Sequence, residues 1–326
     1  MKRIFSFVFR ALFVLAGAAG CIYLYLYVTG YFTPAPAVGY IHSPSRAAYL
    51  DLEVLKNELA ASDVSLLESE EGEAPAAAAQ RLLQLGARVL IVGQDDPQVS
   101  GALLDAAAQA GATLVFVGSD PGAAALAASD KAWYLGSEAA HGGELLGKQV
   151  ALAYRDGVIA DENGDHLLQY ALFQTESGGA HSQFARYALE ECEHYGVYTA
   201  LLEYADGEGE PLPFNAERLT GQQKPEFILC TSPQDARTAY AVAQELGWLE
   251  GDAPVRIGAV AQNREDAQAL VADGVALAVP YYDPQAAARA AAAMAKNAMA
   301  FRFIGQDTGL SPDVEGRFIL PFQLIQ

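Results

Sequence analysis

The sequence is poor in positive charge. Of its 326 residues, 20 are lysine or arginine and 40 are aspartate or glutamate, so the formal net charge at pH 7 is −20. A protein that binds nucleic acid needs a basic surface to neutralise the phosphates. We therefore expect no nucleic-acid partner.

Cysteine and catalytic motifs are equally scarce. The three cysteines, Cys21, Cys192 and Cys230, are too few for a disulfide framework. Cys192 and Cys230 could pair only if the fold brought them together, and we expect two buried free thiols. The chain also lacks a glycine-rich phosphate loop after a strand, a G-x-S-x-G nucleophile elbow and an H-E-x-x-H zinc motif. These absences argue against an enzyme and against nucleotide binding.

The chain has one long apolar run, near its start. The stretch from Ala11 to Phe32 contains no charged residue, and three basic residues come before it. As a helix these 22 residues would be about 33 Å long, enough to cross a hydrocarbon core of about 30 Å. We therefore expect residues 1–32 to be a cytoplasmic basic end and an uncleaved anchor, which places the protein in the cell membrane as a single-pass protein with its main domain outside the cytoplasm. A lipidated or cleaved N-terminus is the alternative, because Ala18–Cys21 could be a lipoprotein processing site.

After a short linker, apolar stretches that suit strands alternate with amphipathic stretches that suit helices. Such alternation predicts right-handed βαβ units on a parallel sheet. It restarts near residue 137, which predicts two doubly wound lobes with a ligand cleft at the carboxyl ends of their strands. The expected strands include Val38–Ile41, Val89–Gly93, Thr113–Val117, Leu168–Phe173, Glu226–Cys230, Val275–Val279 and Arg317–Ile325. The expected parts are a linker at 33–37, a first lobe at 38–136 plus 283–320, and a second lobe at 137–282 plus 321–326.

Oxygen-bearing groups fall at alternate positions of the stretch 161–169. Calcium takes about six to eight oxygen ligands, and an EF-hand loop supplies them with this spacing before ending in a glutamate at its twelfth position. Here the twelfth position is Leu172, so the remaining carboxylate must come from elsewhere in the chain. His166 stands where an EF-hand has glycine and would need a left-handed backbone. The expected loop ligands are Asp161, Asn163, Asp165, the carbonyl of Leu167 and Gln169; the alternative is a polar turn.

Four stretches of the sequence carry a family resemblance: Ser129–Ser137, the loop at 161–169, Val271–Gly274 and Arg317–Phe322. Over roughly residues 38–325 the chain resembles the galactose/glucose-binding periplasmic proteins of bacteria. The resemblance implies an α/β fold of two doubly wound Rossmann-like lobes joined by a three-strand hinge, the periplasmic binding protein type I fold, here preceded by one transmembrane helix. It also implies that Glu226, at the start of a later strand, is the bidentate sixth ligand of Ca²⁺.

The sugar site of that family is matched less well. The family holds a hexose between two aromatic rings within a ring of polar side chains, and the resemblance places Tyr49 and Phe214 at the aromatic positions. Four positions that carry polar groups in the family hold other residues here, namely Ala47, Gly118, Ser232 and Tyr281. Because lost hydrogen-bonding groups reduce affinity, we expect weak binding of glucose and galactose. The candidate ligand-binding residues are Tyr49, Asp120, His181, Arg186, Phe214, Ser232, Gln262 and Asp283.

The resemblance and the anchor together predict a membrane-tethered extracytoplasmic solute-binding protein. It would bind a carbohydrate-like small molecule in the interlobe cleft and carry a structural calcium ion. The expected partner is either an ABC permease, for uptake, or a membrane sensor histidine kinase, since closure of the lobes can report occupancy. The alternative is a non-binding adaptor or structural homologue with a degenerate sugar site.

Overall fold

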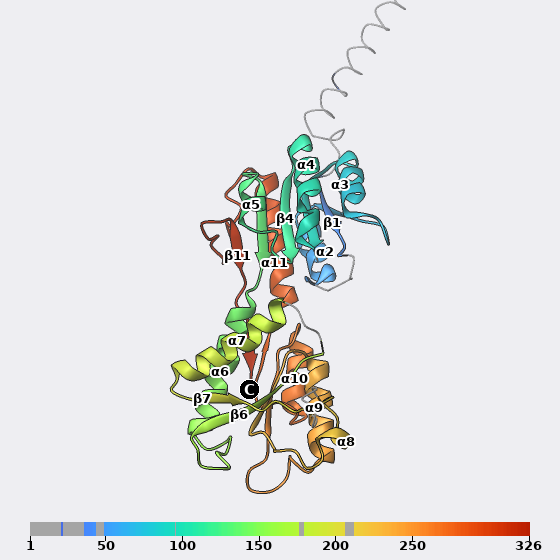
Figure 1. Cartoon of the computed structure of the whole chain (residues 1–326). Helices are drawn as coiled ribbons and strands as arrows, with labels where there is room; N and C mark the ends of the chain where they lie inside the picture. Colours follow the sequence, from blue (N-terminus) through green and yellow to red (C-terminus); the bar gives the residue numbers. More distant parts are fainter. Residues whose placement is uncertain (1–20, 22–35, 44–48, 95, 176–178, 206–211) are drawn as a thin grey trace, which may run out of the picture.

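The computed structural model describes residues 21, 36–43, 49–94, 96–175, 179–205 and 212–326. Figure 1 shows two lobes, each a sheet covered by helices, arranged one beyond the other. The predicted anchor, apart from Cys21, and the departure at Ala47 lie outside the described residues. Among the residues described, no helix is both long enough and apolar enough to span a membrane.

The first lobe is built on a six-stranded sheet in the order β11-β5-β4-β3-β1-β2, in which all pairs are parallel. Side chains of the central strand β3 alternate between its two faces: Val89 and Ile91 join one hydrophobic cluster, and Leu90 and Val92 join the other. This alternation explains why the strand is a continuous apolar run, since both faces are covered. The strands are β1 (Ala37–Ile41), β2 (Ser65–Glu68), β3 (Ala87–Gln94), β4 (Thr113–Gly118), β5 (Ala132–Gly136) and β11 (Arg317–Ile319).

Helices cover both faces of this first sheet. One face packs against α2 (Leu52–Ala60) and α11 (Pro284–Met299), whose alanines lie in the same cluster as the strand residues. The opposite face packs against α3 (Pro75–Gln84), α4 (Ser100–Ala110) and α5 (Ala123–Ala127). The smooth alanine surface of α11 is therefore core packing, because small side chains let the helix lie close to the sheet.

The second lobe repeats this arrangement around a four-stranded parallel sheet in the order β7-β6-β8-β9. Its strands are β6 (Leu167–Phe173), β7 (Tyr198–Leu201), β8 (Phe227–Cys230) and β9 (Arg256–Gly258). One face packs against α6 (Ala139–Arg155) and α7 (Gly179–His194), and the other against α8 (Ala216–Leu219), α9 (Pro233–Glu245) and α10 (Arg264–Ala272). Cys192 and Cys230 are buried free thiols, as expected.

Two strand predictions differ from the structure. The strand expected at Val275–Val279 begins only at Val279, as β10 (Val279–Tyr281). The amides of Val275 and Ala276 instead bond to Leu270 O at the end of α10, so those residues still close the helix. The terminal strand expected at Arg317–Ile325 is split into β11 and β12 (Gln323–Ile325), and β12 pairs antiparallel with β10.

The split places a third crossing between the lobes. Within the described residues the chain passes from one sheet to the other after β5, after β10 and after β11. The first and third crossings are hydrogen-bonded together: Leu320 N donates to Gly136 O (2.7 Å) and Phe322 N to His141 Nδ1 (3.1 Å). A pocket of about 300 Å³ lies beside them, lined by Glu138, Ala140, His141, Glu144, Ile319 and Pro321. Two of the three segments that join the lobes are therefore hydrogen-bonded to each other.

Candidate calcium loop and ligand-binding edge

The loop at 161–169 curls around two carboxylates. Asp161 accepts hydrogen bonds from Gly164 N (2.8 Å) and His166 N (3.0 Å), and Asp165 accepts one from Leu167 N (2.9 Å). The curl needs left-handed backbone at Gly164 (φ 72°) and at His166 (φ 64°). His166 thus adopts the conformation that the loop spacing required of it.

Glu226 reaches this loop from a distant part of the chain. It lies directly before β8 and is only 4% exposed. Its carboxylate accepts hydrogen bonds from Glu162 N (2.8 Å) and Gln169 N (3.0 Å). Burial raises the pKa of Glu226, and the nearby charges of Asp161 and Asp165 raise it further, whereas the two backbone N–H groups lower it. The structure therefore brings Glu226 close to Asp161 and Asp165, and the imidazole of His166 lies 3.0 Å from Asp161 Oδ2.

A fourth polar group of the same region lacks a partner. The hydroxyl of Tyr154, on α6, is buried and makes no hydrogen bond within the described residues. Burial raises its pKa, and the charges of Glu226, Asp161 and Asp165 and a loose contact with the Asp161 carboxylate add to that shift. The hydroxyl therefore lies beside Asp161 without forming a hydrogen bond of normal geometry.

The donor set suits a hard cation, but two amides are turned the wrong way for one. Asn163 Nδ2 and Gln169 Nε2 both donate to Asp165 Oδ2, at 2.9 and 2.7 Å. In this arrangement the described residues contain no group of three or more His, Cys, Asp or Glu side chains placed to hold a metal. A rotation of each amide by half a turn would present its oxygen instead. Two aspartates, a glutamate, two amide oxygens and a carbonyl are the ligand types that Ca²⁺ takes.

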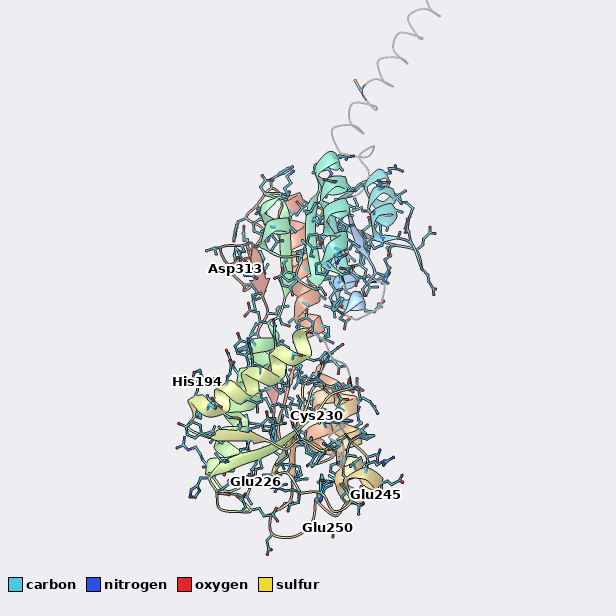
Figure 2. The ribbon with its side chains drawn as sticks, viewed as in Figure 1. His194, Glu226, Cys230, Glu245, Glu250 and Asp313 are labelled. Carbon is cyan, nitrogen blue, oxygen red and sulfur yellow. The ribbon has the colours of Figure 1, made fainter. Side chains whose placement is uncertain are left out.

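The calcium loop and the ligand edge lie at opposite ends of the second lobe. Figure 2 shows Glu226 at the end of the second lobe far from the first lobe, with Cys230 farther along the same strand, toward the first lobe. The carboxyl ends of β6 and β8 therefore face the first lobe, where a doubly wound fold binds its ligand.

A buried carboxylate organises this ligand edge. Asp235, in the first turn of α9, is 1% exposed. It accepts a hydrogen bond of 2.8 Å from Thr175 Oγ1, just beyond β6, and a longer one of 3.4 Å from Thr231 Oγ1, just beyond β8. His181, near the start of α7, contacts Thr231 O through Nδ1 (3.1 Å). These contacts tie together the loops that follow two neighbouring strands.

Close packing of α6 on α7 fixes the helix that carries His181. A Cβ added at Gly143 would lie 2.4 Å from Phe184 O, and one added at Gly147 would lie 2.1 Å from Ala188 O. Only glycine allows backbones to approach so closely. The start of α7 is thus held at the ligand edge by contacts farther along both helices.

The facing edge of the first lobe is rich in tyrosine. Tyr134, on β5, donates to Gly118 O (2.9 Å), and Tyr282 donates to Tyr49 O (2.9 Å). Burial raises the pKa of both phenols. Both therefore stay neutral at physiological pH. Tyr49 lies beside α2 and is packed against the core of this lobe.

Asp120, another predicted ligand residue, forms an ion pair with Arg317 of the same lobe. Its Oδ2 lies 3.1 Å from Arg317 Nη1, and its Oδ1 accepts from Gly122 N (2.7 Å). Arg317 also pairs with Asp313 (2.8 Å) and with Glu315. These acidic partners raise the pKa of Arg317, so it is charged throughout the physiological range.

Two further predicted ligand residues cap helices. Ser232 Oγ accepts from Asp235 N (3.0 Å) at the start of α9. Asp283 Oδ1 accepts from Gln285 N (2.9 Å) and Ala286 N (3.0 Å) at the start of α11. Their polar atoms satisfy backbone donors that a helix start leaves open.

The remaining predicted residues are scattered. Phe214 stacks on Phe173, with ring centroids 4.6 Å apart and planes inclined by 24°. Arg186 is exposed on α7 and pairs with Glu190 at 3.5 Å. Gln262 is exposed beyond β9. Phe214 thus has one face occupied by a neighbouring ring, and Arg186 has an acidic partner on its own helix.

The described departures from the hexose pattern also have structural explanations. Gly118 takes a left-handed φ of 98°, which disfavours a larger residue there. Tyr281 lies within β10 and is 7% exposed, packed in the core of the second lobe.

Sequence reasoning missed Asp235, Thr175 and Arg317. The sequence does carry a signal at Asp235. A serine, here Ser232, followed three residues later by an acid is typical of a helix start. That pattern predicts an acid facing solvent or the backbone, whereas the side chain turns inward to Thr175. Only the pairing of β6 with β8 places the two residues together.

Comparisons with known proteins agree with this architecture. A model of the family described as "Periplasmic binding protein domain" matches residues 60–302. The D-galactose/methyl-galactoside binding periplasmic protein MglB of Haemophilus influenzae is 25% identical over 122 residues, which are 37% of this chain and 37% of that protein.

Solved structures share the fold at low sequence identity. A solute-binding protein from Actinobacillus succinogenes with bound D-allose has a TM-score of 0.61 and 16% identity, covering 89% of this chain and 96% of that one. A periplasmic ribose ABC transporter structure from Conexibacter woesei gives 0.59 and 16%, covering 89% and 92%. A XylFII–LytSN complex gives 0.58 and 12%, covering 89% and 97%. With its two parallel sheets, its hinge and a family match across most of its length, the chain belongs to the periplasmic binding protein domain family.

Proposed function

We propose that this protein is a membrane-tethered extracytoplasmic solute-binding protein that holds a carbohydrate-like ligand between its two lobes. The observation that carries the proposal is the network at the carboxyl ends of β6 and β8. There the buried Asp235 accepts a hydrogen bond from Thr175, and His181 lies beside them. Family relatives that bind a galactoside and D-allose support a sugar as the ligand class.

The proposed ligand is not glucose or galactose. A sugar is fixed by planar polar groups that bond its hydroxyls, and a missing partner costs roughly 1–3 kcal/mol. The side-chain oxygens of Ser232 and Asp283 accept hydrogen bonds from the backbone at helix starts, and Gly118 has no side chain that could bond a sugar. We therefore propose another sugar or a modified one.

Binding rather than catalysis is proposed because the relatives are solute-binding proteins. The anchor at residues 1–32 would keep the protein at the cell membrane and raise its concentration near a membrane partner. That partner would be an ABC permease or a sensor kinase, and the XylFII–LytSN complex supports a protein partner for this fold.

A structural calcium ion is part of the proposal. Asp161, Asn163, Asp165, Gln169, the carbonyl of Leu167 and Glu226 would hold it. The support is the cluster of acids around the buried carboxylate of Glu226 and the unpaired hydroxyl of Tyr154. Bound calcium would stabilise the second lobe at the end opposite to the ligand edge.

A non-binding adaptor is the second candidate. It is favoured by the way the predicted ligand residues are already engaged: Asp120 with Arg317, Arg186 with Glu190 and Phe214 with Phe173. In that case the two lobes would act as a scaffold for a partner, and the cleft would take no sugar.

Calorimetry on the full chain in nanodiscs separates these functions. A panel of hexoses, pentoses and their derivatives is titrated in the presence of calcium. The expected result is binding of a sugar other than glucose or galactose, which His181→Ala weakens at least tenfold. His194→Ala is the matched control, because His194 lies at the far end of the same helix and pairs with Glu191 (3.2 Å).

Two results of this calorimetry would contradict the proposal. Micromolar binding of glucose or galactose contradicts the proposed specificity. No heat with any sugar, from a chain that is folded and bound to calcium, contradicts the ligand proposal and favours the adaptor.

A further inference from the structure

Two large aromatic side chains project from one end of the first lobe. Phe301 is 92% exposed and Phe303 is 60% exposed, directly after the last turn of α11. Leaving an aromatic ring fully exposed forgoes roughly 2–3 kcal/mol of burial free energy; Phe301 forgoes nearly all of it and Phe303 a smaller part. Arg302, between them, is exposed as well. We call Phe301, Arg302 and Phe303 the aromatic tip.

The backbone of the aromatic tip is strained and well braced. Phe301 has a φ of 53°, a left-handed conformation that costs a non-glycine residue roughly 1–2 kcal/mol. The side chain of Asn297 is buried and donates to Ile304 O (3.2 Å) and Gln306 O (2.5 Å). Arg302 N donates to Asn297 O (2.9 Å). The rings are thus held outward on a rigid loop.

The aromatic tip lies at the same end of the lobe as the start of the described main domain. Ser65 N, at the start of β2, bonds to Pro36 O (3.0 Å), and α2 ends just before that strand. Lys296, in the last turn of α11, bonds to Glu58 O near the end of α2 (3.3 Å). Pro36, the end of α2 and the end of α11 are therefore neighbours. In Figure 1 this is the end of the first lobe away from the second lobe.

The predicted anchor must leave the membrane close to this end. It is expected to finish at Phe32, and β1 begins at Ala37, five residues later. Five residues span at most about 18 Å even when fully extended. The end of the lobe that carries the aromatic tip is therefore held within that distance of the lipid surface.

The surface beside the aromatic tip is less acidic than the chain as a whole. The sequence as a whole carries 40 acidic and 20 basic residues. At this end of the lobe, exposed Arg88, Lys131 and Arg302 are matched by exposed Asp63, Asp130 and Asp307, so basic and acidic residues are equal in number there. A basic residue near an anionic lipid surface contributes about 1 kcal/mol.

We infer that the aromatic tip inserts into the lipid interface and orients the first lobe on the membrane. Aromatic rings favour the boundary between headgroups and acyl chains, and such contact would offset both the exposure and the strain of Phe301. The inference rests on the membrane tether of the proposed function. Two attachments, the anchor and the tip, would fix which way the interlobe cleft faces.

Tryptophan fluorescence of the full chain in vesicles tests this inference. Phe301→Trp is compared with Val314→Trp in phosphatidylcholine and phosphatidylglycerol vesicles, with and without lipids brominated near the headgroup end of their acyl chains. Val314 is also fully exposed, and it follows Asp313 at the lateral edge of the lobe (Figure 2). Native Trp133 and Trp248 are present in both variants, so the emission of the unsubstituted chain is subtracted.

The expected result is that brominated lipid removes most of the emission added at position 301 and little of that added at position 314. Equal, weak quenching in both variants overturns the inference. Emission at 301 that is unquenched in lipid vesicles but shifts to the blue in native membranes also overturns it, because a protein would then cover the tip. An alkaline carbonate wash tells the two failures apart: a chain that washes off lacks the tether, and a retained chain without quenching lacks only the tip contact.

Discussion

The effect of Glu226→Gln on the free energy of unfolding should depend on whether calcium is present. Without calcium, glutamine removes a buried charge that faces Asp161 and Asp165. It also leaves one of the two backbone donors, Glu162 N or Gln169 N, without a carboxylate oxygen. The first change stabilises and the second costs roughly 1–3 kcal/mol, so we expect the variant to lie within about 1 kcal/mol of the natural protein.

With calcium the two proteins should diverge. A site filled at a calcium concentration one hundred times its Kd adds about 2.7 kcal/mol to the free energy of unfolding. For a chain of 326 residues that corresponds to a rise in Tm of roughly 3–5 °C. Glutamine offers one neutral oxygen in place of a bidentate carboxylate, so most of that gain should disappear in the variant.

Urea unfolding of the full chain, in chelator and in calcium, measures both differences. Glu162→Gln is the matched control, because the Glu162 side chain faces Lys224 (Nζ–Oε2 2.8 Å) and not the loop interior. It should keep the full calcium effect. A natural protein with the same stability in chelator and in calcium refutes the reasoning, and so does an equal calcium gain in Glu226→Gln.

Three other variants test the described structure. Asp235→Asn should lower the free energy of unfolding by about 2 kcal/mol, because the charged acceptor of Thr175 is lost; urea unfolding measures it. The pKa of Glu73 is lowered to about 2 by its hydrogen bond to Arg81, so its stabilisation is complete above about pH 4.5 and is lost as the pH falls toward 2. In Arg81→Gln the Tm should no longer fall between about pH 4.5 and 2 because of Glu73; a pH series of Tm measures this. Phe301→Gly should raise stability by about 1 kcal/mol, because left-handed strain is released.

Each of these has an outcome that would contradict it. An Asp235→Asn variant as stable as the natural protein would mean that Thr175 finds another acceptor. Parallel pH curves for the natural protein and Arg81→Gln would deny the coupling to Glu73. Val314→Gly is the control for Phe301→Gly, since Val314 is exposed without a left-handed backbone; equal effects of the two changes would remove strain as the cause.

Local patterns in the sequence determined much of the architecture. The apolar runs of β3 and β4 predicted buried parallel strands, because a strand covered on both faces needs apolar side chains at every position. The alternating oxygens at 161–169 predicted a tight loop, and His166 adopts the left-handed backbone which that loop requires. The match to the periplasmic binding protein domain family agrees with the two-lobe fold that the resemblance implied.

The tertiary structure decided which distant residues meet. Glu226 reaches the loop only because β8 pairs with β6, and Asp235 turns to Thr175 across the same pair. It also decided that the terminal segment divides between two sheets, and that Ser232 and Asp283 cap helices. Periodicity along a chain records which face of an element is buried, since neighbours alternate at fixed spacing. It does not record which element covers that face, because such contacts join residues far apart in sequence and depend on how whole helices and strands pack.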